Sequence, residues 1–278
     1  MKIVCSAFTH NGLARPKNED SILCNGWIRN QPMSEPISFR IDLENSGTSV
    51  FALADGLGGH TSGDFASQFV LSSICNAISE SKEVSQAFLS QVLQDVHQAL
   101  FEISGSVSSY SGMGTTVVGL VICPNGEAYI FHVGDSRIYR REDRFFQLLT
   151  KDDRPDSFGY GDIAADSHTQ SLLLQCLGGV TKFTQIAPHV TRLNPIEKPE
   201  TFLLCSDGVS DMISQDEMEE SISESHHSTL QMLFDRVQKS GARDNLSIMM
   251  VEVIPNLLSK MPEENSTNEL RLSEGNYE

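Results

Sequence analysis

Short apolar runs, some alternating with polar residues and others continuous between turn signals, predict strands along most of the chain. Pro124-Asn125-Gly126 separates two such runs, and Asn-Gly is a strong hairpin signal because both residues tolerate positive φ. A second hairpin is predicted to turn at residues 141–144. The predicted strands are residues 2–8, 21–28, 49–54, 115–123, 127–133, 138–139, 145–146, 186–193, 201–205 and 245–254.

From Asp64 onward, apolar residues recur every three or four positions, which is typical of amphipathic helices. One helix is predicted over residues 66–78, another over 88–103 and a short one over 171–177. Two more helices follow Met212. The first begins with the capping box Ser214-x-x-Glu217, and the second ends near Gly241. Because strands and helices are not strictly interleaved, an α+β layered domain fits better than a doubly wound parallel sheet.

The remaining segments are polar and are predicted to be loops. Residues 29–47 separate two predicted strands. Residues 151–169 contain a proline and two glycines, so we expect a mobile loop that helps to select substrates. Glu, Asn and Ser dominate after residue 254, which is typical of disordered chain. The sequence therefore predicts one domain over residues 1–254 and a disordered tail over residues 255–278.

Composition and charge exclude several classes of function. The 278 residues are 39% hydrophobic, which suffices for a sizeable core, and 37 acidic against 20 basic side chains give a net charge of −17. Without a basic cluster, such a surface repels polyanions, so we expect no nucleic-acid partner and no anionic membrane. No apolar stretch approaches the roughly 18–20 residues of a membrane helix.

The start of the chain and the cysteines favour a cytoplasmic protein. The first eight residues alternate, whereas a secretion signal has a charged segment followed by a long apolar run. The six cysteines lie far apart in apolar runs without a C-x-x-C pair, which favours reduced core residues over disulfides or a zinc site. The sequence has no heptads and no evident apolar surface stripe, so we expect a monomer.

Acidic residues stand beside glycine, serine or asparagine at the ends of several predicted strands. A single Asp-Gly is ordinarily a turn, but five such sites in one domain favour a shared function. Carboxylates brought together repel one another unless cations neutralise them. All-oxygen ligation, without Cys or His at ligand spacing, points to Mg²⁺ or Mn²⁺ instead of Zn²⁺. The sites are Asn18-Glu19-Asp20, Asp55-Gly56, Asp135-Ser136, Asp207-Gly208 and Asp244-Asn245.

Six motifs follow one another along the chain: Arg15-x-x-Asn18-Glu19-Asp20, Ala54-Asp55-Gly56-Leu57-Gly58-Gly59-His60, Gly112-Met113-Gly114-Thr115-Thr116, Gly134-Asp135-Ser136-Arg137, Leu204-Cys205-Ser206-Asp207-Gly208 and Asp244-Asn245. In this order they resemble the motifs of the metal-dependent serine/threonine protein phosphatases, the protein phosphatase 2C family, and its bacterial branch in particular. The resemblance spans residues 1–254. It implies a four-layer αββα sandwich, in which helices flank two central antiparallel sheets and a metal centre lies at one end.

The resemblance also implies a ligand set for two Mg²⁺ or Mn²⁺ ions. Asp55 resembles the carboxylate that bridges the two metals. The Gly56 carbonyl and Glu19 resemble ligands of one metal, and Asp207 and Asp244 resemble ligands of the other.

Further positions resemble residues that surround this pair of metals. Asp20 and Asp211 resemble residues that orient metal-bound water and take part in catalysis in this way. Asp135, together with Asp207, resembles the positions that hold a third, weaker metal in bacterial members.

The implied activity is hydrolysis of phosphoserine and phosphothreonine in proteins, which reverses the action of a bacterial Ser/Thr kinase. The implied nucleophile is a hydroxide that bridges two metals about 3.5–4 Å apart. Arg15 is expected to bind the phosphate oxygens through its planar fork. The alternative for Arg15 is a surface charge paired with Glu19 or Asp20. Animal members have a histidine directly after the Asp-Gly, whereas this chain has Leu57 there and His60 three residues later. The general acid is therefore left unassigned.

Two other functions stay open at this point. A catalytically silent sensor or interaction module of the same fold would bind metal without turnover. Another two-metal phosphoesterase, such as a nuclease, would need a basic track for its polyanionic substrate, and the net charge disfavours it.

Overall fold

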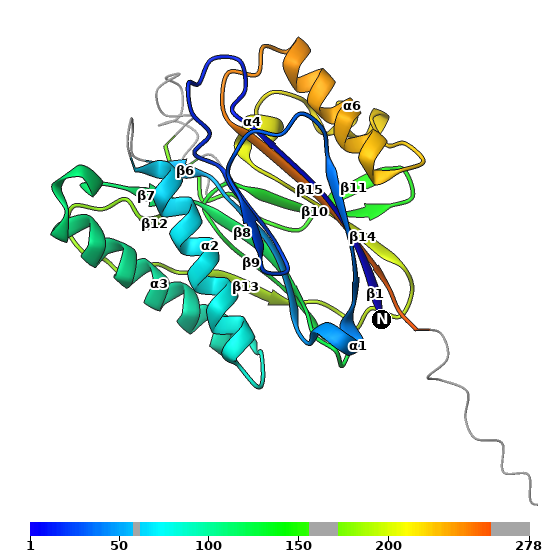
Figure 1. Ribbon diagram of the computed structural model, residues 1–278, viewed down its shortest axis with the longest axis horizontal. Helices are drawn as coiled ribbons and strands as arrows, with labels where there is room; N and C mark the ends of the chain where they lie inside the picture. The colour runs from blue at the N-terminus through cyan, green and yellow to red at the C-terminus, as the bar shows by residue number, and fades with distance from the viewer. Residues whose placement is uncertain (58–61, 156–171, 257–278) are drawn as a thin grey trace, which may run out of the picture.

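Two six-stranded antiparallel sheets stack on each other and form the centre of the fold (Figure 1). The computed structural model describes residues 1–57, 62–155 and 172–256, without the side chains of residues 45 and 46. The strand order is β11-β10-β14-β15-β1-β4 in the first sheet and β13-β9-β8-β5-β2-β3 in the second. A small sheet, β12-β7-β6, packs against helix α2 (Gly63–Glu80).

The first sheet consists of β1 (Lys2–His10), β4 (Ile37–Asp42), β10 (Arg137–Glu142), β11 (Phe145–Leu148), β14 (Glu200–Cys205) and β15 (Leu246–Ile254). The second consists of β2 (Ser21–Cys24), β3 (Trp27–Arg29), β5 (Ser49–Ala54), β8 (Val117–Ile122), β9 (Ala128–Val133) and β13 (His189–Arg192). The small sheet consists of β6 (Gly56–Leu57), β7 (Gly114–Thr115) and β12 (Leu177–Gly178).

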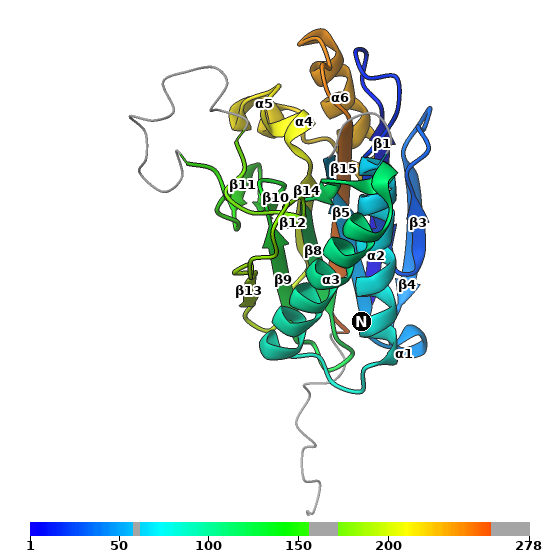
Figure 2. The same cartoon turned by 90° about the vertical axis from the view of Figure 1, so that its left-hand side faces the viewer.

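Helices cover both outer faces of the sandwich. Figure 2 shows α2 and the longer α3 side by side over the second sheet, and α6 packs on β1 and β15 of the first sheet. Besides α2, the helices are α1 (Leu43–Ser46), α3 (Gln86–Ser106), the 3₁₀ turn η1 (Ser108–Tyr110), α4 (Asp207–Ser210), α5 (Gln215–Glu220) and α6 (His226–Lys239).

Strand β5 shows why some strands read as continuous apolar runs. All six of its residues are buried. Phe51 and Leu53 point into the core between the two sheets, whereas Val50 and Ala52 point into a second core against α2 and α3. A strand covered on both faces has no polar alternation. The ends of such strands are therefore the first places where the chain can present carboxylates.

The predicted α+β class, with two antiparallel sheets flanked by helices, is confirmed. The two long helices are confirmed as α2 and α3, and the capping box is present at the start of α5, where Ser214 and Glu217 cap each other. Gly241 has a φ of 107° just beyond α6, which agrees with a predicted helix end there.

Three predictions about local structure were wrong. Residues 21–28 are a hairpin of β2 and β3, because Asn25 and Gly26 adopt φ values of 45° and 94° and turn the chain. The predicted loop 29–47 contains β4, an edge strand in which Ile37, Phe39 and Ile41 alternate with polar residues, a strand signal that the prediction overlooked. Residues 172–176 form no helix, and Leu177–Gly178 pair with β7.

Other predictions fall partly or wholly on residues outside the described ones. These are His60, most of the loop 151–169 and nearly all of the tail 255–278. The domain boundary after residue 254 stays a prediction.

Gly119 in β8 provides a test of how tightly the second sheet packs. A Cβ at this position would lie 2.2 Å from Cζ of Phe131, the cross-strand partner on β9. We expect Gly119→Ala to lower the free energy of unfolding by about 1–3 kcal/mol, because the ring must leave its position. Urea denaturation measures this. As the control, Gly105→Ala in α3 meets no atom within 4 Å and should be neutral or slightly stabilising; equal midpoints for the two variants would contradict the packing argument.

Candidate active site

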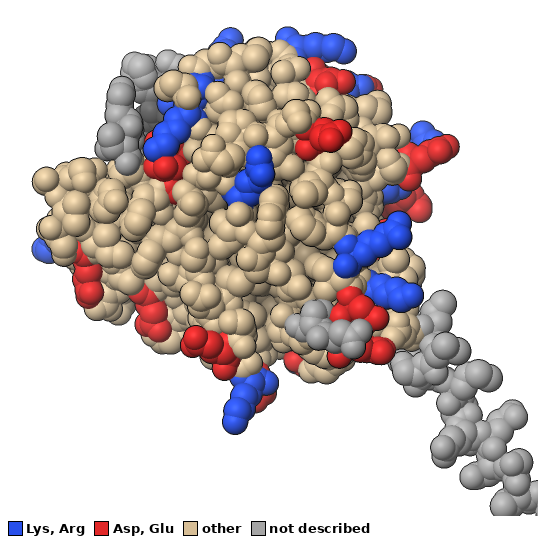
Figure 3. Space-filling view, viewed as in Figure 1, with Lys and Arg blue, Asp and Glu red and all other residues tan. Residues whose placement is uncertain are grey.

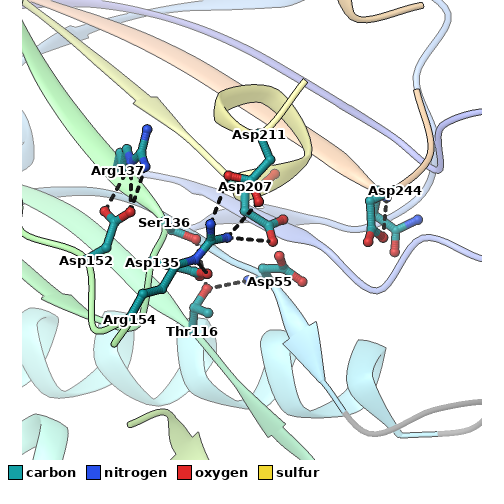
Figure 4. Close-up of polar contacts among 12 residues, drawn as sticks. Asp55, Thr116, Asp135, Ser136, Arg137, Asp152, Arg154, Asp207, Asp211 and Asp244 are labelled. Carbon is teal, nitrogen blue, oxygen red and sulfur yellow. Dashed lines mark hydrogen bonds and ion pairs between the residues drawn. The ribbon is translucent and has the colours of Figure 1, made fainter. Parts of the chain in front are cut away.

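Five of the carboxylates from the sequence motifs meet in one pocket of about 440 Å³. They come from segments far apart in the chain, each at or next to the end of a strand or short helix. Figure 4 shows the carboxylates of Asp55, Asp135 and Asp207 gathered at this place. Arg15 and Gly56 also line the pocket. The five acidic residues are Glu19, Asp55, Asp135, Asp207 and Asp244.

Asp55 is held by Thr115, the last residue of β7, and by Thr116, which follows it. Its N–H donates to Thr116 Oγ1 at 3.1 Å, and its carbonyl accepts from the Thr116 N–H at 2.9 Å and from Thr115 Oγ1 at 2.7 Å. Thr116 in turn contacts the hydroxyl of Ser136 at 2.8 Å, next to Asp135. These bonds connect the ends of three neighbouring strands and fix the position of Asp55 relative to Asp135.

Gly56 allows three backbone segments to approach closely. A Cβ on Gly56 would lie 2.2 Å from the carbonyl oxygen of Gly63 and 2.7 Å from that of Glu19. Ser67 Oγ donates to the Glu19 carbonyl at 2.6 Å, which attaches the Glu19 segment to α2. The close approach brings Glu19 and the Gly56 carbonyl to the same side of the pocket, and no residue with a side chain fits at position 56 without a shift.

Asn245 attaches the loop that carries Arg15 and Glu19 to the start of β15. Its Oδ1 accepts from the Glu19 N–H at 2.8 Å, and its Nδ2 donates to the carbonyls of Lys17 at 2.8 Å and Asn11 at 3.1 Å. Asn245 is buried, so each of these bonds replaces one to water. The sequence marked Asn245 only as a turn-forming neighbour of Asp244, and its clamping role depends on contacts across the fold.

Burial shapes the electrostatics of the carboxylates. It raises the pKa of Asp20 to about 7 and that of Asp207 to about 7, and neighbouring carboxylates add to both shifts. For the same reasons the pKa of Asp55 lies well above its ordinary value. Among the described residues, Oδ1 of Asp20 and Oδ1 of Asp207 are buried without a hydrogen-bond partner. Crowded carboxylate oxygens with unused acceptor capacity fit a hard divalent cation.

Asp20 lies behind the pocket wall and is fully buried. Its Oδ2 accepts from Ser206 Oγ at 2.9 Å, and Ser206 Oγ accepts from the Ser247 N–H at 2.9 Å. Asp20, directly before β2 of the second sheet, is thereby joined to Ser206, directly after β14, and to β15 of the first sheet.

Arg15 lies at the edge of the pocket with a side chain that is 55% exposed. Its Nη2 is 2.7 Å from Oδ2 of Asp244. This partner differs from the Glu19 or Asp20 pairing that the sequence left as an alternative. The exposed guanidinium keeps donors available to a ligand in the pocket.

Arg154 is the residue of the site that the sequence analysis missed. Its Nε lies 2.6 Å from Oδ2 of Asp135, its Nη1 and Nη2 lie 3.0 and 2.8 Å from the two oxygens of Asp211, and its Nη2 lies 3.4 Å from Oδ2 of Asp207. The predicted site residues Asp135 and Asp211 are thus joined through this guanidinium. No local sequence pattern indicated a role for Arg154 in the site, because an arginine in a polar loop is ordinarily a surface charge.

Comparison with known proteins assigns the chain to a family. The sequence profile described as Protein phosphatase 2C matches residues 38–250, well over half of the chain. The chain belongs to the protein phosphatase 2C family. The resemblance drawn from the six motifs is thereby confirmed.

Curated relatives of this protein phosphatase 2C chain include two bacterial phosphatases. The serine/threonine phosphatase stp of Listeria monocytogenes serotype 4b (strain F2365) is 28% identical over 257 residues, which cover 88% of this chain and 93% of stp. The serine/threonine protein phosphatase PstP of Mycobacterium tuberculosis (strain ATCC 25618 / H37Rv) is 27% identical over 263 residues, which cover 90% of this chain and 45% of PstP.

Solved structures share the fold. The catalytic domain of PstP in complex with two manganese ions is 25% identical with a TM-score of 0.71, over 92% of this chain and all of that domain. The serine/threonine phosphatase of S. agalactiae has a TM-score of 0.74 at 21% identity, over 90% of this chain and 98% of that chain. Within the described residues, no helix is long and apolar enough to cross a membrane.

A second cluster of potential ligands lies outside the pocket of this phosphatase-family fold. One ligand atom each of His132, Asp153 and His189 lies within 4.8 Å of the others. The two imidazole rings are stacked, with centroids 4.3 Å apart and planes at 10°. Ring nitrogens bind metal through lone pairs in the ring plane, so stacked rings do not aim both at one ion. His189 Nε2 lies 2.9 Å from Oδ1 of Asp153. We therefore infer that the cluster holds the loop of Asp153 in place.

The raised pKa of Asp20 predicts a pH-dependent stability of the metal-free protein. The folded state binds this proton more tightly than the unfolded chain, so Asp20 lowers stability as the pH rises from about 4 to about 7. We expect metal-free Asp20→Asn to gain a few degrees in Tm relative to the wild type between pH 5 and pH 8. Thermal melts of both chelator-treated proteins at pH 5 and at pH 8 measure this gain. The same Tm difference between Asp20→Asn and the wild type at the two pH values would contradict the prediction.

The clamp at Asn245 predicts a loss of stability on truncation. Asn245→Ala leaves the Glu19 N–H and the carbonyls of Lys17 and Asn11 without their partner, and we expect a cost of about 3 kcal/mol in the free energy of unfolding. Denaturant titration checks this. Asn76→Ala, at an exposed position of α2, serves as the control and should change stability by less than about 0.5 kcal/mol. Similar values for both variants would show that the clamp contributes little.

Proposed function

We propose that this protein phosphatase 2C member hydrolyses phosphoserine and phosphothreonine in proteins with two Mg²⁺ or Mn²⁺ ions. The observation that carries the proposal is the meeting of five acidic side chains from separate segments in one pocket. The relatives stp and PstP, which are phosphatases by name, and the manganese complex of PstP support it.

The two cations would lie on either side of Asp55. On one side, Glu19 and the Gly56 carbonyl are close because Gly56 lacks a side chain. On the other side, Asp207 and Asp244 supply carboxylates, and Oδ1 of Asp207 has no hydrogen-bond partner among the described residues. A pair of divalent cations would lower the pKa of water, so that hydroxide is available near neutral pH to attack phosphorus, and would stabilise charge on the phosphoryl oxygens.

The protein's own side chains position the reactants. Arg15, exposed at the pocket edge, would bind two phosphoryl oxygens through its planar fork and place phosphorus over the carboxylates. Asp20 accepts from Ser206 at Oδ2, and its buried Oδ1, which has no hydrogen-bond partner within the described part of the chain, would accept a hydrogen bond from a water molecule and orient it. Asp211 is held by Arg154 and is partly exposed, and it would orient a water molecule on the Arg154 side of the pocket.

We further propose that the protein acts in the cytoplasm as a monomer and opposes a Ser/Thr kinase. The six cysteines are free, including Cys5 and Cys24, whose sulfur atoms lie 3.4 Å apart. Free thiols at this separation support a reducing compartment. The substrates would then be phosphorylated proteins of the same compartment.

The two alternative functions find less support. On the face of the molecule in Figure 3, the described Lys and Arg side chains are scattered among Asp and Glu, which is no track for a nucleic acid. A silent sensor would retain metal binding without a need for Arg15 at the pocket edge.

The function predicts metal-dependent phosphate release from a phosphothreonine peptide. We expect the wild type to be active with Mn²⁺ and inactive with excess EDTA. Asp207→Asn should lose about 100-fold or more in kcat/KM, because it removes a charged ligand atom from the cations. Asp235→Asn, at an exposed position of α6, is the matched control and should retain wild-type activity.

Other outcomes would refute the proposal in different ways. Mn²⁺ binding by calorimetry without phosphate release from any phosphopeptide would favour the silent sensor. Cleavage of oligonucleotides in the absence of phosphopeptide hydrolysis would favour a nuclease.

A further inference from the structure

Three carboxylates at one side of the pocket surround a positive charge that belongs to the chain itself. Arg154 is 8% exposed and contacts Asp135 at 2.6 Å, Asp211 at 2.8 Å and Asp207 at 3.4 Å. Figure 4 shows its guanidinium between Asp135 and the Asp207–Asp211 helical turn. Each of the three ion pairs uses a nitrogen of the same planar group, so a single side chain neutralises three carboxylates from two segments.

The position of Arg154 is built into the fold by its two neighbours. Asp152 accepts from Nε and Nη2 of Arg137 on β10, with distances of 2.7–3.1 Å. Asp153 accepts from the Gly134 N–H at 2.8 Å, and its own N–H donates to the Gly134 carbonyl at 3.0 Å. The backbone leading to Arg154 is thus attached to the residues that carry Asp135, which leaves the guanidinium little freedom to withdraw.

The two sides of the pocket therefore differ in how their positive charge is held. On the side of Glu19, Asp55 and Asp244, Arg15 pairs with Asp244 through a side chain that is 55% exposed, whereas Arg154 is buried among its three carboxylates. An arginine does not lose its proton in proteins, so its charge is permanent. A divalent cation placed between Asp135 and Asp211 would meet this charge at close range and would lose the carboxylate oxygens that already accept from Arg154.

We propose that the Arg154 guanidinium is the resident cation of the Asp135–Asp211 side, so that the chain binds two divalent cations and not a third one at Asp135 and Asp207. The proposal rests on the proposed metal site in the same pocket. It implies that loss of the arginine charge opens a third cation site there.

The number of Mn²⁺ ions bound per chain tests this directly. The full chain is stripped with a chelator and desalted, and bound manganese is measured by equilibrium dialysis with elemental analysis over rising Mn²⁺ concentrations. We expect two ions in the wild type, two in Arg154→Lys and three in Arg154→Ala. Arg236→Ala, which also breaks an arginine–carboxylate pair, with Glu220, but away from the pocket, is the matched control and should bind two. Far-UV circular dichroism verifies that each variant is folded.

Several results would overturn the inference. These are three ions in the wild type or in Arg154→Lys, or only two in a folded Arg154→Ala. Should Arg154→Ala fail to fold, Arg154→Gln decides, because it removes the charge and keeps most of the side-chain volume: three ions would support the proposal and two would overturn it.

The failure of this inference is distinguishable from the failure of the proposed function. A wild type with two Mn²⁺ ions that releases no phosphate would refute the phosphatase function and support the inference. An active wild type with three ions would overturn the inference alone, and a wild type that binds no Mn²⁺ would overturn both.

Discussion

The repulsion between carboxylates that the two sheets hold together is the constraint on which the rest of the site depends. Burial raises the pKa values of Asp20, Asp55 and Asp207, and neighbouring carboxylates raise each of them further. Charged oxygens in such surroundings are unfavourable unless they are protonated, paired or bound to metal. The folding energy of the sandwich therefore maintains a cluster that is unfavourable in itself, and cation binding relieves that cost.

Hydrogen bonds across the fold, together with the ion pairs of Arg154, prevent the cluster from spreading apart. Asn245 clamps the loop before β2, Thr116 fixes Asp55, and Ser206 connects Asp20 to the opposite sheet. The bonds of Asn245 and Thr116 join uncharged groups, so neither salt nor pH within the physiological range weakens them, whereas the bond to Asp20 depends on the protonation of a carboxyl with a pKa of about 7. Glycines complete the arrangement, since Gly56 and Gly208 lie where any Cβ would collide with neighbouring backbone. The ligand atoms are thus positioned before a cation arrives.

Arg154 divides this acidic pocket into two parts with different requirements. On its side, the chain supplies the positive charge through a side chain that Gly134, Asp152 and Asp153 hold in place. On the other side, the chain supplies only the exposed Arg15 beside Asp244, and cations from solution would neutralise Glu19 and Asp55. The division explains how a protein with a net charge of −17 can crowd so many carboxylates at the end of its strands.

The sequence by itself determined the elements with strong local signals. The long helices α2 and α3 follow from apolar spacing, the β8–β9 hairpin from Asn125-Gly126 and the start of α5 from its capping box. Its motifs also named the family and the acidic residues that meet in the pocket. These features depend on residues close together in the chain, or on short motifs that can be compared one by one.

Only the tertiary structure decided the rest, because it depends on residues far apart in the chain. Strand β4 pairs with β1, and no local pattern in the sequence indicates that partner. Asn245 became a clamp because Lys17 and Glu19 lie beside it, more than 200 positions away in sequence. Arg154 reads as an ordinary surface charge until the fold surrounds it with Asp135 and Asp211. Packing and long-range electrostatics, which no local pattern records, set both the order of the strands and the distribution of charge in the site.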